Sequence, residues 1–155
     1  MNIRRPLNLI LAIVIFTLSS TCYAAPEKFT TLNQDIIERD FYKPEKLTLI
    51  IFWASWCPTC ISEMPELKQL HTMLDHWDII GANVNIKSED GIAAQKKYTI
   101  PFPSIHDPKL VLADRFNIRG TPGFIIINTQ GEIALKTNRL GKTLYEIIDK
   151  LNYQI

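Results

Sequence analysis

Two cysteines separated by two residues are the part of this sequence best suited to chemistry. Cys57 and Cys60 stand in the segment Trp56-Cys57-Pro58-Thr59-Cys60, directly after an apolar run and directly before a stretch with helical periodicity. A strand, a turn and a helix in this order place the first sulfur at a helix start. Unpaired backbone N–H groups and the helix dipole favour a thiolate there, so Cys57 is the predicted nucleophile.

This spacing predicts thiol-disulfide exchange. The reaction needs an accessible thiolate and a second thiol close enough to attack the mixed disulfide. Two intervening residues at a helix start meet that need, because they let the pair close into a disulfide without straining the helix. We expect an exposed Cys57 with a lowered pKa, and we expect Cys60 one turn inside the helix, where it resolves the intermediate. Trp56 is expected to shield one side of the site.

The elements that must position the cysteines alternate between strands and helices. The continuous apolar run 47–54 predicts a strand buried on both faces of a sheet. Apolar residues at helical spacing predict a helix from Pro58 to Leu74, kinked near Pro65. Further elements are predicted as strands at 79–84 and 103–106, helices at 88–98, 109–116 and 143–151, and an antiparallel hairpin at 123–136. This order predicts an α/β fold, in which a central mixed sheet starts with a parallel βαβ unit and carries helices on both faces.

Length and charge limit the classes of protein to consider. A chain of 155 residues suffices for one domain with a proper core. It carries 17 basic and 16 acidic residues spread along its length, for a net charge of +1. This balance argues against a nucleic-acid-binding surface.

The first 24 residues resemble an export signal rather than part of the fold. Arg4 and Arg5 precede the apolar stretch 7–18, and small residues follow up to Ala24. We expect cleavage after Ala24 and a periplasmic or otherwise extracytoplasmic protein, with an uncleaved membrane anchor as the alternative. Cleavage would remove Cys22, which leaves the Cys57/Cys60 pair as the only thiols.

The rest of the chain divides into two segments. Residues 25–46 have no clear period and are interpreted as an N-terminal lead-in with a short helix around residues 35–39. Residues 47–155 are predicted to form the single folded domain.

The segment around the cysteines resembles a known family. Residues 52–65 read F-W-A-S-W-C-P-T-C-I-S-E-M-P, which matches the pattern F-W-A-x-W-C-x-x-C-x-x-E-x-P. This pattern is typical of the TlpA/ResA/DsbE-like exported thiol-disulfide oxidoreductases, which have the three-layer thioredoxin-like fold. The resemblance implies that Glu63 assists proton transfer. It further implies a cis-proline at Pro122 that faces the cysteines, and it gives as substrate-contact candidates Trp56, Pro58, Thr59, Thr121 and Pro122.

The resemblance also implies a direction of electron flow and a set of partners. Proteins of this family mostly reduce specific partner proteins, as in cytochrome c maturation, and are reduced in turn by a membrane-bound electron donor. We therefore expect a monomer that uses the redox-active Cys57–Cys60 disulfide and needs no cofactor and no metal. An oxidase or isomerase of secreted proteins is the alternative, because the sequence does not determine a redox potential.

Other thiol chemistries fit the sequence less well. His71 and His76 follow the cysteines and approach the pattern of a zinc module, although the gap of ten residues between Cys60 and His71 is shorter than usual. A non-enzymatic metal-binding module is therefore kept as an alternative. A peroxiredoxin-type peroxidase would carry P-x-x-x-T-x-x-C, and that pattern does not precede Cys57. A copper-delivery module would have three residues between its cysteines and a distal histidine as a further copper ligand. His106 does not stand in a position that suits this ligand.

Overall fold

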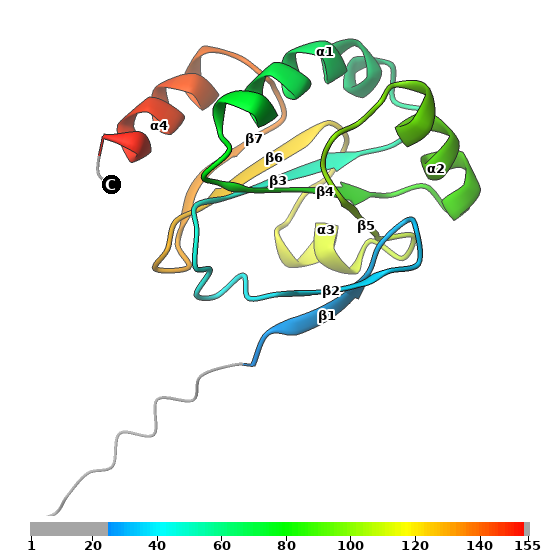
Figure 1. The fold of residues 1–155 in the computed structure, drawn as a ribbon, viewed down its shortest axis with the longest axis horizontal. Helices are drawn as coiled ribbons and strands as arrows, with labels where there is room; N and C mark the ends of the chain where they lie inside the picture. Colours follow the sequence, from blue (N-terminus) through cyan, green and yellow to red (C-terminus); the bar gives the residue numbers. More distant parts are fainter. Residues whose placement is uncertain (1–24, 154–155) are drawn as a thin grey trace, which may run out of the picture.

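The computed structural model describes residues 25–153, and the predicted signal at 1–24 lies outside this range. Figure 1 shows the arrangement of its elements. The strands are β1 (Glu27–Thr30), β2 (Ile36–Arg39), β3 (Thr48–Trp53), β4 (Asp78–Asn83), β5 (Ser104–His106), β6 (Gly123–Ile127) and β7 (Ile133–Thr137). The helices are α1 (Pro58–Met73), α2 (Ser88–Lys97), α3 (Val111–Arg115) and α4 (Lys142–Asn152). The elements predicted between residues 47 and 151 are therefore all present.

The central sheet has five strands in the order β5-β4-β3-β6-β7. β3 pairs with β4 in parallel and β4 pairs with β5 in parallel, whereas β6 is antiparallel to β3 and to β7. All six residues of β3 are buried, as expected for a central strand with both faces covered. The predicted mixed sheet with a parallel start and a C-terminal antiparallel hairpin is confirmed.

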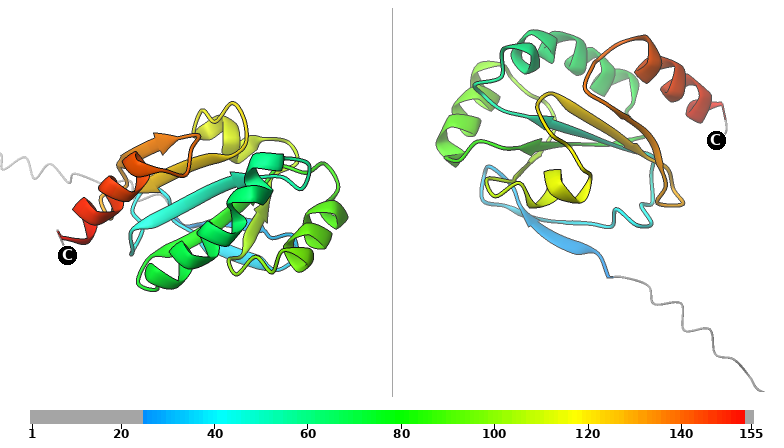
Figure 2. Two further views of the ribbon diagram at one scale, coloured as in Figure 1. Left: turned by 90° about the horizontal axis from the view of Figure 1, so that it is seen from above. Right: turned by 180° about the vertical axis from the view of Figure 1, so that it is seen from behind.

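Helices cover both faces of this sheet. One face carries α1, α2 and α4, and α3 lies on the opposite face (Figures 1 and 2). The first core cluster joins side chains of α1, α2 and α4, such as Leu67, Ala94 and Ile148, to the upper face of the sheet. The second cluster contains Leu112 and Phe116, which pack under the sheet. Two cores, one on each face, make the three layers of a thioredoxin-like fold.

The N-terminal segment forms a β-hairpin, so the expected short helix around residues 35–39 is wrong. β2 pairs with β1 in antiparallel register, with Phe29 opposite Ile37. Burial alternates along β2, and Ile37 and Phe29 pack against the second core cluster. The period of two and the pairing with β1 favour a strand over a helix. The hairpin also reaches the edge of the sheet, where Thr31 forms a bridge with Ile105.

Helix α1 begins next to the cysteines and crosses the sheet. Pro58 occupies its first turn, where its missing N–H costs no hydrogen bond. Pro65 lies inside the helix, as predicted, and is exposed. Met64, Leu67 and Leu70 are buried against the sheet, and this packing holds the helix in place.

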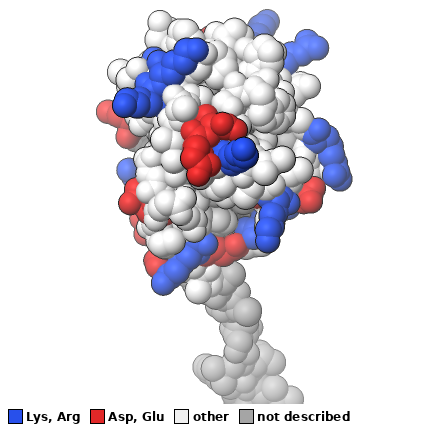
Figure 3. Space-filling model, turned by 90° about the vertical axis from the view of Figure 1, so that its right-hand side faces the viewer, with Lys and Arg blue, Asp and Glu red and all other residues white. Residues whose placement is uncertain are grey.

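Charge is distributed without a dominant sign. On the face shown in Figure 3, basic and acidic side chains are spread among uncharged residues and in places lie side by side. None of the helices described between residues 25 and 153 is long and apolar enough to cross a membrane.

Candidate functional site

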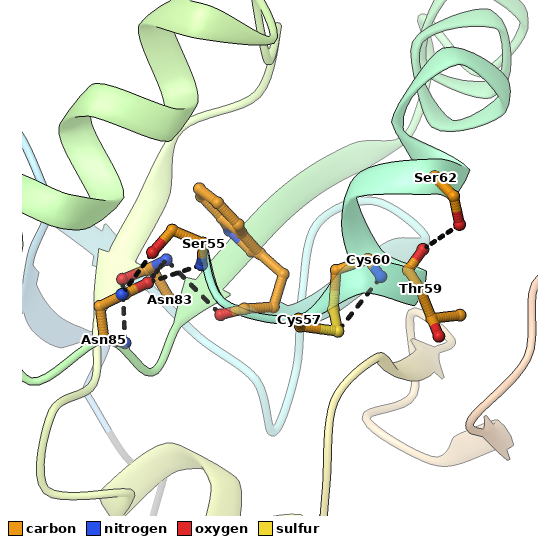
Figure 4. Close-up of a disulfide and its surroundings, with 8 residues drawn as sticks. Ser55, Cys57, Thr59, Cys60, Ser62, Asn83 and Asn85 are labelled. Carbon is orange, nitrogen blue, oxygen red and sulfur yellow. Dashed lines mark hydrogen bonds between the residues drawn. A yellow bond between two sulfur atoms is a disulfide. The ribbon is translucent and has the colours of Figure 1, made fainter.

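Cys57 and Cys60 form a disulfide at the start of α1 (Figure 4). Their Cα atoms are 5.3 Å apart. Cys57 is the N-cap residue of the helix, and its Sγ accepts a hydrogen bond from the backbone N–H of Cys60 at 3.1 Å. The same N–H group and the helix dipole would stabilise a negative charge on Cys57 Sγ once the disulfide is reduced. The predicted position of the first sulfur at a helix start is confirmed.

Both sulfur-bearing residues are buried in this disulfide form. Cys57 exposes 4% of its surface and Cys60 exposes 1%. The expected exposure of Cys57 is therefore wrong here, because its side chain is tied to Cys60 and packs into the first core cluster. Trp56, the residue before it, is 65% exposed and stands at the surface. The disulfide is therefore shielded from solvent, while the side chain next to it is not.

Glu63 lies one helical turn after Cys60, on the same side of α1. Residues three apart on a helix have Cβ atoms about 5–6 Å from each other. The side chain is half-buried, and its Oε2 atom has no hydrogen-bond partner among the residues described. Burial raises the pKa of Glu63, the backbone N–H of Leu140 lowers it, and the charge of Glu66 raises it again. The net shift of this pKa is upward, so the carboxyl group holds a proton more tightly than an exposed glutamate does.

The segment before β6 lines two grooves, one together with Thr59 and the other together with Trp56. The Thr121–Pro122 peptide bond is cis, as the resemblance implies. Thr121 is half-buried and Pro122 is buried. One is an apolar groove of about 610 Å³, whose lining includes Trp56, Val84, Ile86, Leu110, Ile118 and Thr121. The other is a cationic groove of about 680 Å³, whose lining includes Thr59, Arg119, Thr121, Pro122, Lys136 and Arg139.

These grooves bring together most of the residues predicted to contact a substrate. Trp56 and Thr121 share the apolar groove, and Thr59 shares the cationic groove with Thr121 and Pro122. Pro58 is exposed beside them on the first turn of α1 but is not part of either lining. Their roles in substrate contact stay predictions.

A buried amide network holds the loop that leads to Cys57, and the sequence did not reveal it. Asn85 Oδ1 accepts hydrogen bonds from the backbone N–H of Ser55 at 2.9 Å and from Asn83 Nδ2 at 3.0 Å. Asn85 Nδ2 donates to Ser55 Oγ at 2.7 Å, and Figure 4 shows these side chains converging on the loop. Asn83 and Asn85 are almost fully buried. The end of β4 thus fixes the backbone two residues before the nucleophile.

The zinc alternative conflicts with the geometry of α1. His71 comes eleven residues after Cys60 in the same helix, which separates them by about 16 Å along its axis. His76 lies beyond the end of this helix and contacts Asp75 and Asn152. The two cysteines and the two histidines therefore cannot share one tetrahedral metal ion.

Comparison with known proteins identifies the family. A family model described as AhpC/TSA family matches residues 22–136, well over half of the chain. The chain belongs to the AhpC/TSA family. One sequence relative of the chain is the sporulation thiol-disulfide oxidoreductase A of Bacillus subtilis, which is 30% identical over 120 residues that cover 71% of this chain and 70% of the relative. Another is the thiol-disulfide oxidoreductase ResA of Halalkalibacterium halodurans, which is 34% identical over 54% of this chain and 48% of that protein. The matched region thus spans 48% of the length of one relative and 70% of the other.

Similar solved structures confirm the fold. A secreted disulfide oxidoreductase of Mycobacterium tuberculosis superimposes with a TM-score of 0.69 at 21% identity, covering 80% of this chain and 95% of that one. The C-terminal domain of a thiol-disulfide oxidoreductase from Bacteroides thetaiotaomicron gives a TM-score of 0.70 at 23% identity, covering 86% and 95%. The thioredoxin-like fold predicted from the sequence is therefore confirmed.

Proposed function

We propose that this protein is a thiol-disulfide oxidoreductase that reduces a disulfide in a partner protein. The Cys57–Cys60 disulfide at the start of α1 is the observation that carries the proposal. The sequence relatives support it, because two of those compared are named thiol-disulfide oxidoreductases. The grooves beside Thr121 and Pro122, which Thr59 and Trp56 also line, support a role of this segment in holding the partner.

The reaction proceeds in two exchange steps. Cys57 thiolate attacks one sulfur of the partner's disulfide, which forms a mixed disulfide and releases the partner's other sulfur as a thiolate. Cys60 then loses its proton and attacks Cys57 Sγ, which closes the Cys57–Cys60 disulfide and releases the second partner thiolate. Two electrons pass to the partner, and its two sulfurs take up two protons. A reductant outside this chain must then reopen the disulfide.

Glu63 is proposed to take the proton from Cys60 in the second step. It is one turn away from Cys60, and burial raises its pKa, which makes the carboxylate a better proton acceptor than an exposed glutamate. The buried Oε2 atom without a partner is available for this exchange.

Replacing Glu63 by glutamine tests this role through the dependence on pH. We expect the variant to slow the resolution step by roughly ten- to a hundredfold, and to change the pH profile of disulfide reduction.

The stability of the protein should change too. Since folding raises this pKa above its ordinary value of 4.5, ionisation of Glu63 lowers stability as pH rises through the raised pKa.

Glu63→Gln should therefore be more stable than the parent protein at pH 7 and equally stable below pH 4.5, as measured by urea unfolding at both pH values. The exposed Glu89→Gln is a matched control on α2. An unchanged pH profile for reduction would exclude Glu63 from proton transfer.

We further propose that the protein acts on a protein substrate outside the cytoplasm, either as a free monomer or attached to the membrane by an uncleaved anchor. The predicted signal at residues 1–24 supports export. A relative named soluble secreted antigen in Mycobacterium tuberculosis supports the same location. A membrane-bound donor that returns electrons to Cys57 and Cys60 completes the cycle, and cytochrome c maturation is a setting consistent with it.

A direct test of the proposed function uses the reduced protein and a protein disulfide such as that of insulin. We expect the insulin disulfides to be reduced and Cys57 and Cys60 to be oxidised in equal amount. Alkylation of the free thiols and mass measurement quantify both changes. Insulin that stays oxidised, while Cys57 and Cys60 remain reduced, would contradict the proposal.

A further inference from the structure

We propose that the partner segment entering this site carries an acidic side chain within about two residues of its target cysteine, and that Lys136 and Arg139 recognise it. The inference rests on the proposed function and adds the chemistry of the substrate. It comes from the contrast between the two grooves that flank Thr121 and Pro122.

The cationic groove carries positive charge that nearby acidic residues do not balance. Its lining holds Arg119, Lys136 and Arg139 and no acidic residue. Arg119 is 3.6 Å from Asp114, whereas Lys136 and Arg139 have no ion pair within the described part of the chain. The whole chain is nearly neutral at +1, so these cations are a local feature. A groove whose charged residues are all basic attracts a negatively charged group.

Arg139 is held close to the reactive segment by the sheet and by α1. Lys136 lies opposite Ile125 in the β6–β7 pairing, and Arg139, two residues beyond the end of β7, lines the same groove as Pro122. The backbone N–H of Arg139 donates to Thr137 Oγ1 at 3.3 Å. The next residue, Leu140, donates its N–H toward Glu63 on α1. The loop is therefore tied to both elements that border the disulfide.

The position of the cations sets where the acidic residue must lie. Thr59, two residues after Cys57, lines the cationic groove together with Pro122. A partner segment bonded to Cys57 in extended form advances about 3.3 Å per residue, so a side chain two residues from its cysteine lies about 7 Å away. This distance brings it over the groove, while residues on the other side of its cysteine reach the apolar groove at Trp56 and Ile86.

Two synthetic peptides distinguish this recognition from general disulfide reactivity. Each peptide chain has one cysteine and forms a disulfide-linked homodimer. In one peptide the residues two positions before and two positions after the cysteine are glutamate, and in the other peptide they are lysine. The rate constant for reduction by the reduced protein is measured at 50 mM salt and divided by the rate constant for reduction by dithiothreitol, a small thiol without a binding groove, at the same pH and salt concentration. This ratio removes the effect of the peptide charges on the leaving thiol.

We expect the glutamate peptide to react three- to tenfold faster than the lysine peptide on this scale, because two exposed ion pairs contribute modestly. Lys136→Gln with Arg139→Gln should bring the preference to about one, and the charge-reversed pair Lys136→Glu with Arg139→Glu should invert it. Lys96→Gln on α2 is the matched control and should keep the preference. Salt at 0.5 M should reduce the preference to less than twofold, since it screens exposed charges.

The outcomes separate this inference from the proposed function. Equal rates for both peptides, or a preference that persists without Lys136 and Arg139, would overturn the inference and leave the proposed function standing. An equal loss of rate for both peptides in the double variants would assign the cations to the reactivity of Cys57 and would also overturn it. If neither peptide is reduced by the parent protein, the proposed function fails and the inference fails with it.

Discussion

Replacing Cys60 by serine is expected to leave the protein covalently joined to its partner through Cys57. The first exchange step needs only Cys57, whose Sγ stands at the helix N-terminus and accepts the N–H of residue 60. The second step needs a thiol at position 60, so the mixed disulfide persists when that thiol is missing. Expression of Cys60→Ser in cells, followed by acid quenching and non-reducing electrophoresis, should show a species that disappears on reduction and whose partner can be identified.

Replacing Cys57 by serine is the matched control for this experiment. We expect the variant to form no mixed disulfide and to lose at least roughly a thousandfold of its rate of disulfide reduction, because serine is not a nucleophile toward disulfides at neutral pH. The double variant Cys57→Ser with Cys60→Ser should behave in the same way. A trapped species of equal yield in Cys57→Ser would show that Cys60 is the attacking residue and would contradict the assigned roles.

Replacing Gly81 by alanine is expected to cause the largest loss of stability that a single methyl group can cause near the site. Gly81 lies in β4, and a Cβ atom there would overlap Ser104 Oγ and would lie 2.9 Å from Trp53 Nε1. Trp53 Nε1 donates a buried hydrogen bond to Ser104 Oγ at 3.1 Å, at the end of the strand that leads to Cys57. The methyl group therefore overpacks the core and separates these partners, at a cost of about 2–4 kcal/mol in the free energy of unfolding.

Urea unfolding at pH 7 measures this loss, and Gly120→Ala is its control. A Cβ atom at Gly120 would meet no atom within 4 Å, so this variant should change the free energy of unfolding by less than about 0.5 kcal/mol. A cost for Gly81→Ala that is no larger than the cost for Gly120→Ala would show that the contact between β4, Trp53 and Ser104 is relaxed in solution.

The parts of the fold with strong local patterns were predictable from the sequence. The apolar run at 47–54 could only be a buried strand or a helix segment, and its β-branched residues together with the helical spacing that follows favoured the strand. The turn at Gly131 likewise marked the β6–β7 hairpin. By contrast, the pattern at 35–39 contains only two adjacent isoleucines between polar residues, and the pairing with β1 that makes it a strand is not visible locally.

The site was predictable where it depends on neighbours in sequence. Cys57, Cys60 and Glu63 follow from their spacing and from the resemblance of residues 52–65 to a known family. The exposure of Cys57 was not predictable, because it depends on packing against distant elements in the disulfide form. The link between Asn85 and Ser55 joins residues 30 positions apart, and the Asn83-Val84-Asn85 segment has no local feature that indicates it.

The charges of the cationic groove were hidden for a similar reason. Lys136 lies in the edge strand β7 and Arg139 follows that strand. Charged residues are common at such edges, where they prevent strand pairing between molecules. Only the folded structure shows that Lys136 and Arg139 line one groove together with Pro122.

The redox potential of the Cys57/Cys60 couple tests the proposed role as a reductant most directly. The purified protein is equilibrated with buffers of reduced and oxidised dithiothreitol, and the fraction of free Cys57 and Cys60 thiols is measured after acid quenching and alkylation. We predict a midpoint potential near that of thioredoxin, at about −270 mV. A midpoint near about −120 mV, the value of the strong oxidant DsbA, would contradict the proposed direction of electron flow.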